Sequence, residues 1–175
     1  MRRSARMILP AALVVLLVLA AALLALRAGQ DGKGAGASQT MRVSYVVDGD
    51  TVIVDDEEGE RVHVRLIGID TPEISHSGGP SECFGIRAAR LTRSLALGRQ
   101  VVLVPGRERH DRYGRLLAYV QIVGGPDDLE ATLLERGAAR TLAIAPNTDR
   151  AARYAELERA ARRAGRGLWS ACGTR

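Results

Sequence analysis

The sequence of 175 residues has few aromatic side chains and few cysteines. Only six residues are Phe, Trp or Tyr, two are Cys and three are His. Two cysteines exclude a disulfide-dense miniprotein, and three histidines without ligand-like spacing argue against a zinc site. Because 46% of the residues are apolar, an intrinsically disordered chain is also excluded. The length allows one domain of ordinary size with a packed core.

The N-terminal region contains a long apolar run. Residues 7–26 carry no charge and follow Arg2, Arg3 and Arg6. Twenty residues of helix span about 30 Å, the thickness of the hydrocarbon core of a bilayer. The arginines before the run predict a cytoplasmic N-terminus and an extracytoplasmic remainder. We therefore expect residues 1–26 to be an uncleaved signal anchor that inserts into the membrane, or a leader whose cleavage secretes the rest.

The net charge is unevenly distributed along the chain. Residues 27–40 are Gly, Ala and polar residues and predict a flexible tether, which leaves residues 41–175 as one domain. Of the net charge of +5, only +1 belongs to this domain, which has 20 basic and 19 acidic residues. Within it, residues 41–73 sum to −6 and residues 74–175 to +7. The domain therefore has an acidic and a basic part rather than a uniformly basic surface.

Periodicity indicates an α+β fold. Alternation of apolar and polar residues predicts five strands, over 42–47, 51–54, 61–67, 100–104 and 116–123. Three- and four-residue spacing predicts helices over 82–97 and 128–136, and a last helix from Asn147 or Thr148 to Gly165. Five short strands with an inserted helix and a helical tail predict a small Greek-key barrel with helices packed against it.

Carboxylates are concentrated in the acidic part of the domain. Asp48 and Asp50 flank a glycine in a tight turn, and Asp70 and Glu73 follow the third predicted strand, which carries Arg65. Carboxylates are hard oxygen ligands of the kind that Ca²⁺ or Mg²⁺ prefers, whereas Zn²⁺ favours His or Cys. This segment is therefore the candidate metal site of the sequence.

A second candidate segment is the turn His110-Asp111-Arg112-Tyr113-Gly114-Arg115, which presents Arg115 at the start of a strand. A planar guanidinium binds oxyanions through two parallel hydrogen bonds. Two arginines, Arg65 and Arg115, beside a carboxylate-bound divalent cation are suited to binding a phosphodiester.

None of these segments is specific by itself. Residues 48–51 also form a good hairpin turn without a metal, and residues 70–73 are compatible with a simple turn or helix start. Residues 111–115 are compatible with a solvated loop that carries a surface ion pair. The acidic run 55–60 is interpreted as a solvated turn without a role.

In combination, the motifs resemble the staphylococcal-nuclease-like (thermonuclease) family. They are Asp48-Gly49-Asp50-Thr51, Arg65-Leu66-Ile67-Gly68-Ile69-Asp70-Thr71-Pro72-Glu73, Asp111-Arg112-Tyr113-Gly114-Arg115 and Gly167-Leu168-Trp169. The resemblance covers about residues 41–173. It implies a five-stranded OB-fold barrel with about three helices and a Ca²⁺-dependent phosphodiesterase that acts on DNA and RNA.

The resemblance also implies roles for individual residues. It makes Asp50, Asp70 and the Thr71 carbonyl the Ca²⁺ ligands, with Asp48 in the outer shell. It makes Glu73 the general base on water, and Arg65 and Arg115 the groups that hold the scissile phosphate. The expected substrate contacts are Arg112 and Tyr113.

Two features depart from the best-known family member. A Tyr-x-Tyr pair that stacks on a base is replaced by aliphatic residues within 142–147, so substrate affinity is expected to be weaker or to depend on Tyr113. The chain also has Cys83 and Cys172, which are compatible with two buried thiols or with a disulfide. Export would favour the disulfide, which would pin the helix near Glu82 to the C-terminal segment.

Two other functions remain open at the level of the sequence. An OB-fold can be a non-catalytic module that binds nucleic acid or protein, and a membrane-tethered scaffold can carry a merely structural metal site. The intact set of arginines and carboxylates favours the nuclease. A weak Ca²⁺ site of this kind is typical of extracellular modules, in agreement with an extracytoplasmic domain.

Overall fold

The structure is a computed structural model that describes residues 40–56 and 58–173. The expected membrane segment, residues 7–26, and nearly all of the expected tether lie outside these ranges. Within the described ranges, no helix is long and apolar enough to cross a bilayer.

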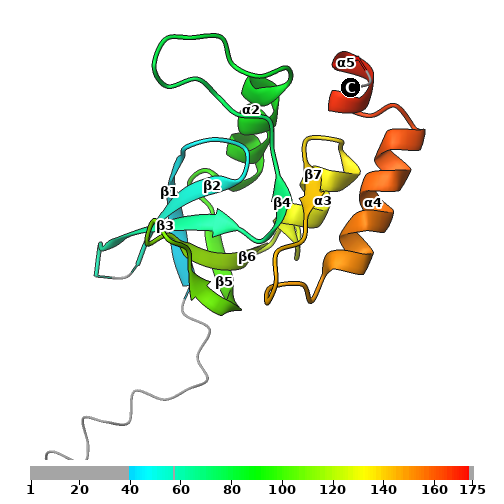
Figure 1. The fold of residues 1–175 in the computed structure, drawn as a ribbon. Coiled ribbons are helices and arrows are strands. Elements are labelled where there is room, and N and C mark those ends of the chain that lie inside the picture. Colours follow the sequence, from blue (N-terminus) through cyan, green and yellow to red (C-terminus); the bar gives the residue numbers. More distant parts are fainter. Residues whose placement is uncertain (1–39, 57, 174–175) are drawn as a thin grey trace, which may run out of the picture. The chain divides into compact units, whose positions relative to one another are not determined.

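Five strands close into a barrel (Figure 1). They are β1 (Thr40–Val46), β2 (Thr51–Asp55), β3 (Arg61–Leu66), β5 (Gln100–His110) and β6 (Leu116–Ile122). Their order is β1-β2-β3-β6-β5, and β1 pairs with β5 to close the barrel. The β3–β6 pair is parallel and the other pairs are antiparallel. The predicted five-stranded, OB-like barrel is thus confirmed.

The barrel interior is filled by small, branched side chains. Val52 and Val54 of β2 are completely buried, as is Val64 of β3, whereas the intervening Ile53 and His63 are more exposed. This alternation is the two-residue period of a strand with one buried face. The core is therefore built mainly from β-branched residues, which pack well on a pleated surface.

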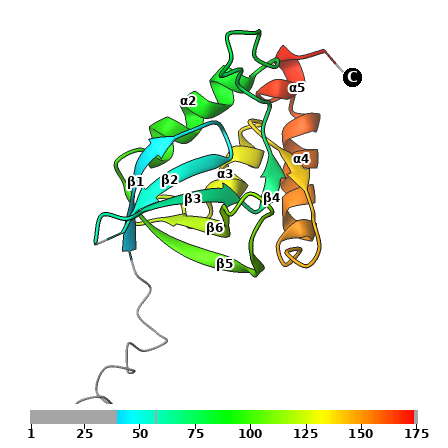
Figure 2. The same ribbon diagram turned by 60° about the vertical axis from the view of Figure 1, so that its left-hand side comes forward.

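Helices and a small second sheet flank the barrel (Figure 2). The helices are α2 (Gly85–Ala96), α3 (Leu129–Glu135), α4 (Ala151–Arg163) and α5 (Leu168–Ala171). The second sheet pairs β4 (Gly68–Asp70) with β7 (Arg140–Leu142). α2 packs on β1, α3 packs between β6 and α4, and α4 also contacts β4 and β7.

The element bounds differ from the prediction in several places. β5 continues beyond residue 104 to His110, because pairing with β6 resumes at His110 after an irregularity that begins at Pro105. α2 begins at Gly85 rather than residue 82, since Phe84 adopts a left-handed φ of 74°. The last long helix begins at Ala151. The described residues also form the short elements β4, β7 and α5, which are too brief for a periodic signal.

Candidate active site

The turn between β1 and β2 brings two carboxylates to one end of the barrel. The backbone N–H of Asp50 donates to Asp48 Oδ1 at 3.0 Å, an arrangement that closes the turn locally. A Cβ added at Gly49 would lie 2.5 Å from Thr71 Oγ1. Glycine is therefore needed here because the turn packs directly on the segment that follows β4. The hydroxyl of Thr92 on α2 donates to the Gly49 carbonyl at 2.7 Å and holds the turn from the other side.

Asp50 joins this turn to the loop after β4. Its side chain is buried, and Oδ2 accepts hydrogen bonds from the Thr71 backbone N–H at 2.8 Å and the Thr71 hydroxyl at 3.2 Å. Its Oδ1 lies 3.2 Å from Nε of Arg65. The hydrogen-bond network thus places Asp50 and Thr71, which are 21 positions apart in the sequence, in direct contact.

Arg65 on β3 lies at the centre of the acidic cluster, and its side chain is only 14% exposed. Nη1 donates to the carbonyls of Leu66 at 2.7 Å and Ile69 at 2.9 Å, while Nη2 lies 3.3 Å from Asp70 Oδ1. Nε lies beside Asp50. These contacts use the forked, planar donor set of a guanidinium, which a lysine ammonium lacks. Arg65 is consequently held in one orientation.

The cluster carries more negative charge than Arg65 offsets. Burial, with smaller contributions from the charges of Asp48 and Asp70, raises the pKa of Asp50 to about 7 against the lowering effect of Arg65. Burial, followed by the charges of Asp48 and Asp70, also raises the pKa of Glu73. Mutual repulsion among carboxylates opposes ionisation, and a bound cation would relieve it.

The donor set of the cluster fits a hard divalent cation. Asp50 and Asp70 offer carboxylate oxygens and Thr71 offers a backbone carbonyl, which are the ligand types that Ca²⁺ takes. Among the residues that the structure describes, no group of three or more His, Cys, Asp or Glu side chains lies close enough together to bind a metal. Two carboxylates and one carbonyl would therefore need water molecules to complete the coordination of Ca²⁺.

The β5–β6 turn presents the second arginine. Asp111 Oδ1 accepts hydrogen bonds from the backbone N–H groups of Tyr113 and Arg115, both at 2.9 Å, and Oδ2 accepts from Arg115 Nε at 2.7 Å. Burial raises the pKa of Asp111, but the hydrogen bonds from Arg115 and Tyr113 outweigh this effect and bring that pKa below its usual value. Asp111 stays ionised and fixes the guanidinium plane of Arg115, which remains 31% exposed.

Tyr113 projects from the same turn and is 70% exposed. The Arg112 guanidinium carbon lies 5.1 Å from the centre of its ring, and that of Arg115 lies 5.5 Å from it. Cation–π attraction at these distances helps to hold the exposed ring in place. The turn therefore offers a flat aromatic face between two positive charges.

A cavity of about 380 Å³ lies between the two arginines. Its walls include Arg65 and Arg115, the Tyr113 ring and the exposed aliphatic side chains of Leu142 and Ile144. Small-molecule sites in proteins have similar volumes and the same mixture of apolar walls with a few polar groups. The arrangement can bind an anionic group at the guanidiniums and a flat, weakly polar group against Tyr113 and the aliphatic wall.

The structure thus places the expected site residues in two groups that share Arg65. In the first group, Asp50 and Asp70 contact its guanidinium, and Asp48 and Thr71 are hydrogen-bonded to Asp50. In the second, Arg65 lines the cavity together with Arg115. Glu73 is exposed, follows Pro72, and is close enough to Asp48, Asp70 and Arg65 for their charges to affect its pKa.

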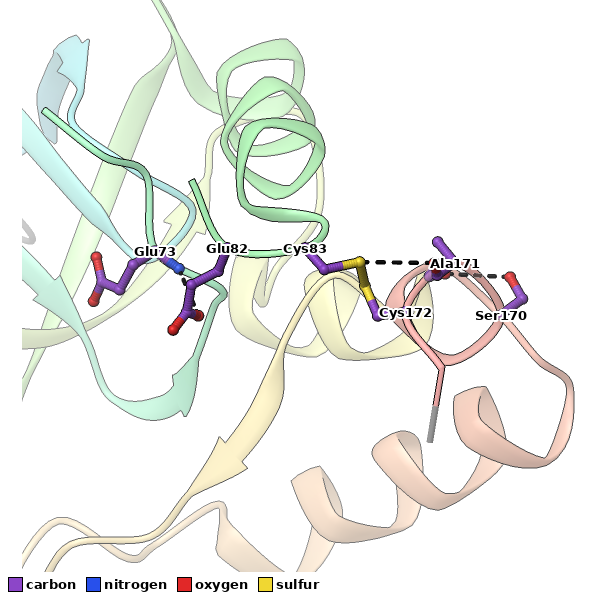
Figure 3. Close-up of a disulfide and its surroundings, with 7 residues drawn as sticks. Glu73, Glu82, Cys83, Ser170, Ala171 and Cys172 are labelled. Atoms are coloured by element: carbon purple, nitrogen blue, oxygen red, sulfur yellow. Dashed lines mark hydrogen bonds between the residues drawn. A yellow bond between two sulfur atoms is a disulfide. The ribbon is translucent and has the colours of Figure 1, made fainter. Parts of the chain in front are cut away.

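The expected cysteine pair lies outside both groups. The sulfur atoms of Cys83 and Cys172 are 2.06 Å apart and form a disulfide between the residues before α2 and those after α5 (Figure 3). The cavity lining does not include either cysteine.

Asn147 is a further residue of the site, although the sequence pattern predicts only that a helix starts there. It lines the cavity, its Oδ1 accepts from the Glu108 N–H at 3.0 Å, and its Nδ2 donates to the Glu108 carbonyl at 2.9 Å. A Cβ at Gly106 would lie 2.5 Å from the Asn147 amide, so the two segments are in close contact. The Pro-Asn pair was visible in the sequence, but its partner on β5 was not.

Comparisons with known proteins identify a family and several relatives that are similar to this chain. A family model described as staphylococcal nuclease homologue matches residues 63–171. The thermonuclease of Staphylococcus hyicus is 34% identical over 142 residues, which cover 79% of this chain and 82% of that protein. The thermonuclease of Staphylococcus intermedius is 39% identical over 105 residues, or 60% of this chain and 61% of that protein. A probable endonuclease of Komagataella phaffii is 32% identical over 117 residues, or 64% and 50%.

Proposed function

The chain belongs to the staphylococcal nuclease family and is a nuclease, and from this premise we propose that it is an exported, Ca²⁺-dependent enzyme that hydrolyses phosphodiester bonds of DNA and RNA. The observation that carries the proposal is the position of Arg65, which contacts the acidic cluster and also lines the cavity that contains Arg115. A phosphodiester bound between these arginines would lie next to the carboxylates that the reaction needs.

The two arginines bind the scissile phosphate in this proposal. Hydrolysis builds negative charge on the phosphoryl oxygens, and the guanidiniums of Arg65 and Arg115 donate charge-assisted hydrogen bonds to them. Both are pre-positioned, Arg65 by two carbonyls and two carboxylates and Arg115 by Asp111. Pre-positioned donors need little reorganisation as the charge develops.

Glu73 is the proposed general base that takes a proton from the attacking water. Its pKa is raised by burial and by Asp48 and Asp70, which makes its carboxylate a stronger base than an ordinary surface glutamate. A positioned carboxylate base typically contributes about 10²- to 10⁴-fold to the rate.

Asp50, Asp70 and the Thr71 carbonyl are the proposed ligands of Ca²⁺, with Asp48 in the outer shell. When bound, Ca²⁺ would supply a positive charge that acts as a Lewis acid toward the phosphate. The hydrogen bonds from Thr71 to Asp50 hold together the two segments that carry these proposed ligands.

Arg112 and Tyr113 are the proposed contacts to the substrate beyond the scissile bond. Base stacking on an aromatic ring contributes about 1–3 kcal/mol per base and tolerates any base, which fits action on both DNA and RNA. Leu142 and Ile144 supply an aliphatic surface in the cavity, where the best-known family member has its Tyr-x-Tyr pair. The Tyr113 ring then provides the aromatic stacking contact of this cavity.

The proposed location is extracytoplasmic, either tethered through residues 7–26 or secreted after cleavage. The Cys83–Cys172 disulfide supports this placement, because structural disulfides persist mainly in oxidising compartments. Fractionation of cells that produce the full chain tests it: membrane-bound or secreted protein supports export, and reduced protein in the cytoplasm contradicts it.

The function is tested with the purified full-length chain. Single-stranded DNA and RNA are incubated with Ca²⁺ or with a chelator, and the same assay is run on Glu73→Ala and on Glu156→Ala, which removes an exposed glutamate of α4. Cleavage that requires Ca²⁺, survives Glu156→Ala and falls about 10²- to 10⁴-fold in Glu73→Ala supports the proposal. Bound but intact substrate under all conditions would instead identify a non-catalytic binding module.

A further inference from the structure

We propose that Glu82 is a positioning residue for Glu73, and that the Cys83–Cys172 disulfide keeps Glu82 in place. The inference rests on the proposed role of Glu73 as the base. It makes catalytic turnover depend on the redox state of a bond that lies outside the cavity.

Glu82 holds the backbone of Glu73 through two hydrogen bonds, of which Figure 3 shows the one that its side chain accepts. The Glu73 N–H donates to Glu82 Oε2 at 3.1 Å, and the Glu82 N–H donates to the Glu73 carbonyl at 3.0 Å. The Glu73 carboxylate points away from Glu82 in Figure 3 and is thus free to act on a substrate. One residue therefore secures both backbone groups of Glu73 and leaves its side chain available.

The two ends of the loop that joins the two glutamates are held together by a further hydrogen bond and by packing. The Ser75 N–H donates to Ser81 Oγ at 3.1 Å, just inside the Glu73–Glu82 pair. A Cβ added at Gly85 would lie 2.4 Å from the Glu73 carbonyl oxygen and 2.9 Å from that of Pro72. The start of α2 therefore packs against the backbone of Glu73, and a shift of residues 82–85 would move it.

The disulfide links the Glu82 end of this loop to the C-terminal segment. Cys83 directly follows Glu82, and Cys172 directly follows α5. α5 is itself anchored, because Leu168 is buried and its N–H donates to the Gly137 carbonyl at 2.9 Å. Since Glu82 is exposed, its hydrogen bonds compete with water, and a covalent link at the next residue limits how far it can move.

Reduction would remove this restraint. A dithiol reductant transfers two electrons and two protons. Its thiolate attacks one sulfur, the protein S–S bond breaks, and the other cysteine leaves as a thiolate that takes up a proton while a mixed disulfide forms. The second thiol of the reductant then displaces the remaining cysteine as a thiol, and the reductant becomes a cyclic disulfide. Cys83 is exposed and therefore accessible to such a reagent. The products are two free thiols and a Glu73 segment that is held only by hydrogen bonds.

The first test removes the acceptor on Glu82 while the disulfide stays intact. In the full chain with Ca²⁺, Glu82→Ala is expected to lower kcat on the order of tenfold, because small misplacements of a catalytic group are costly, and to leave KM within twofold. Glu82→Gln retains an oxygen that can accept from the Glu73 N–H and is expected to keep kcat within twofold of wild type. Equal kcat values for the Ala and Gln variants, or an effect on KM alone, would overturn the inference.

A double-mutant cycle separates positioning from a general loss of structure. If Glu82 acts through Glu73, Glu82→Ala causes no further loss of kcat in a Glu73→Ala background. The same tenfold loss in both backgrounds would overturn the inference. Full activity of Glu73→Ala alone would overturn the proposed base instead, so the two failures are distinguishable.

The second test breaks the disulfide. Wild type reduced by dithiothreitol, with complete reduction verified by thiol titration, and the double variant Cys83→Ser/Cys172→Ser are assayed at a temperature at which circular dichroism shows both folded. We expect kcat to fall about as far as in Glu82→Ala, and reduction to cause no added loss in Glu82→Ala. Wild-type kcat after complete reduction would overturn the role of the disulfide.

Discussion

Two clusters of carboxylates occupy different parts of this fold, and only one has the features of an active site. The first surrounds Arg65 and contains Asp48, Asp50, Asp70 and Glu73. The second joins α3, α4 and β6 and contains Asp128 and Glu130. Both hold acids with raised pKa values, so a raised pKa alone does not distinguish catalysis from structure.

The two clusters differ in how their charge is balanced. Asp128 caps α3 by accepting from the Ala131 N–H at 2.8 Å, accepts from the Tyr154 hydroxyl at 2.8 Å, and faces Arg150 and Arg153 at 3.0 and 3.1 Å. Two arginines thus contact the single acid Asp128, whereas in the first cluster the single arginine Arg65 contacts both Asp50 and Asp70. Balanced charge stabilises a fold, while an excess of carboxylates leaves a place for a cation.

The same substitution, Arg to Lys, in both clusters gives the strongest test of whether one cluster serves catalysis and the other stability. Arg65→Lys is expected to lower kcat/KM on the order of 10²- to 10³-fold, nearly as much as Arg65→Ala, because an ammonium cannot reproduce the bidentate contacts. Arg150→Lys is expected to lower the free energy of unfolding and leave kcat/KM within twofold. Steady-state kinetics at saturating Ca²⁺ measures both, and near-wild-type turnover by Arg65→Lys contradicts the phosphate-binding role.

Removal of the central acid of the second cluster should affect stability rather than catalysis. Asp128→Ala removes the α3 cap and leaves Arg150 without its anion, so we expect a loss of about 3 kcal/mol in the free energy of unfolding. Nη1 of Arg150 is buried and has no hydrogen-bond partner among the described residues, so its contact with Asp128 is purely ionic. Urea titration measures the loss. Activity per folded molecule should remain, and its disappearance would show that the two clusters are coupled.

The close approach within the first cluster can be disturbed without any change of charge. Gly49→Ala would place a methyl group 2.5 Å from Thr71 Oγ1. We therefore expect the free energy of unfolding to fall by about 1–3 kcal/mol, and half-maximal activity to require a higher Ca²⁺ concentration. Gly79→Ala is the matched control, because its methyl group would meet only Ser75 Oγ at 3.4 Å. Thermal unfolding and Ca²⁺ titration of activity are the measurements. Similar behaviour of the two variants would refute the packing argument.

The smallest expected effect is a pH-dependent stability that originates at Glu130. This carboxyl is fully buried, both of its oxygens lie within 3.3 Å of the Val120 N–H, and burial raises its pKa well above the usual value. Ionisation therefore costs more in the folded than in the unfolded protein, and Glu130 makes the fold less stable as pH rises above about 4.5. The contribution changes by at most about 1.4 kcal/mol per pH unit.

Glu130→Gln tests this effect through urea unfolding at several pH values. The variant is expected to gain stability over wild type as pH increases and to match it at low pH, with unchanged kcat. A parallel pH dependence of the two proteins would show that Glu130 is not the group responsible.

The sequence predicted some parts of the site better than others. The Asp48–Asp50 turn, the Asp70–Glu73 segment and the Asp111–Arg115 turn were visible because each is a short run of characteristic residues. The contacts of Arg65 with the carbonyls of Leu66 and Ile69 were not, since they need the bend between β3 and β4 at Gly68, where φ is 83°. The Glu73–Glu82 pair was also missed, because loop closure leaves no periodic signal.

The sequence by itself determined the local elements and the family. Alternating valines specify strands with one buried face, and ordered motifs at characteristic spacing are readable without a structure. Only the tertiary structure decided which charges meet. Pairing of β2 with β3 brings Asp50 against Arg65, and the segment after β4 returns Thr71 to Asp50. Packing of α3 on α4 places Asp128 against Arg150 at a separate location, because contacts between distant segments depend on strand pairing and helix packing. Thus the same residue types form a cluster with excess negative charge in one place and a structural support in the other.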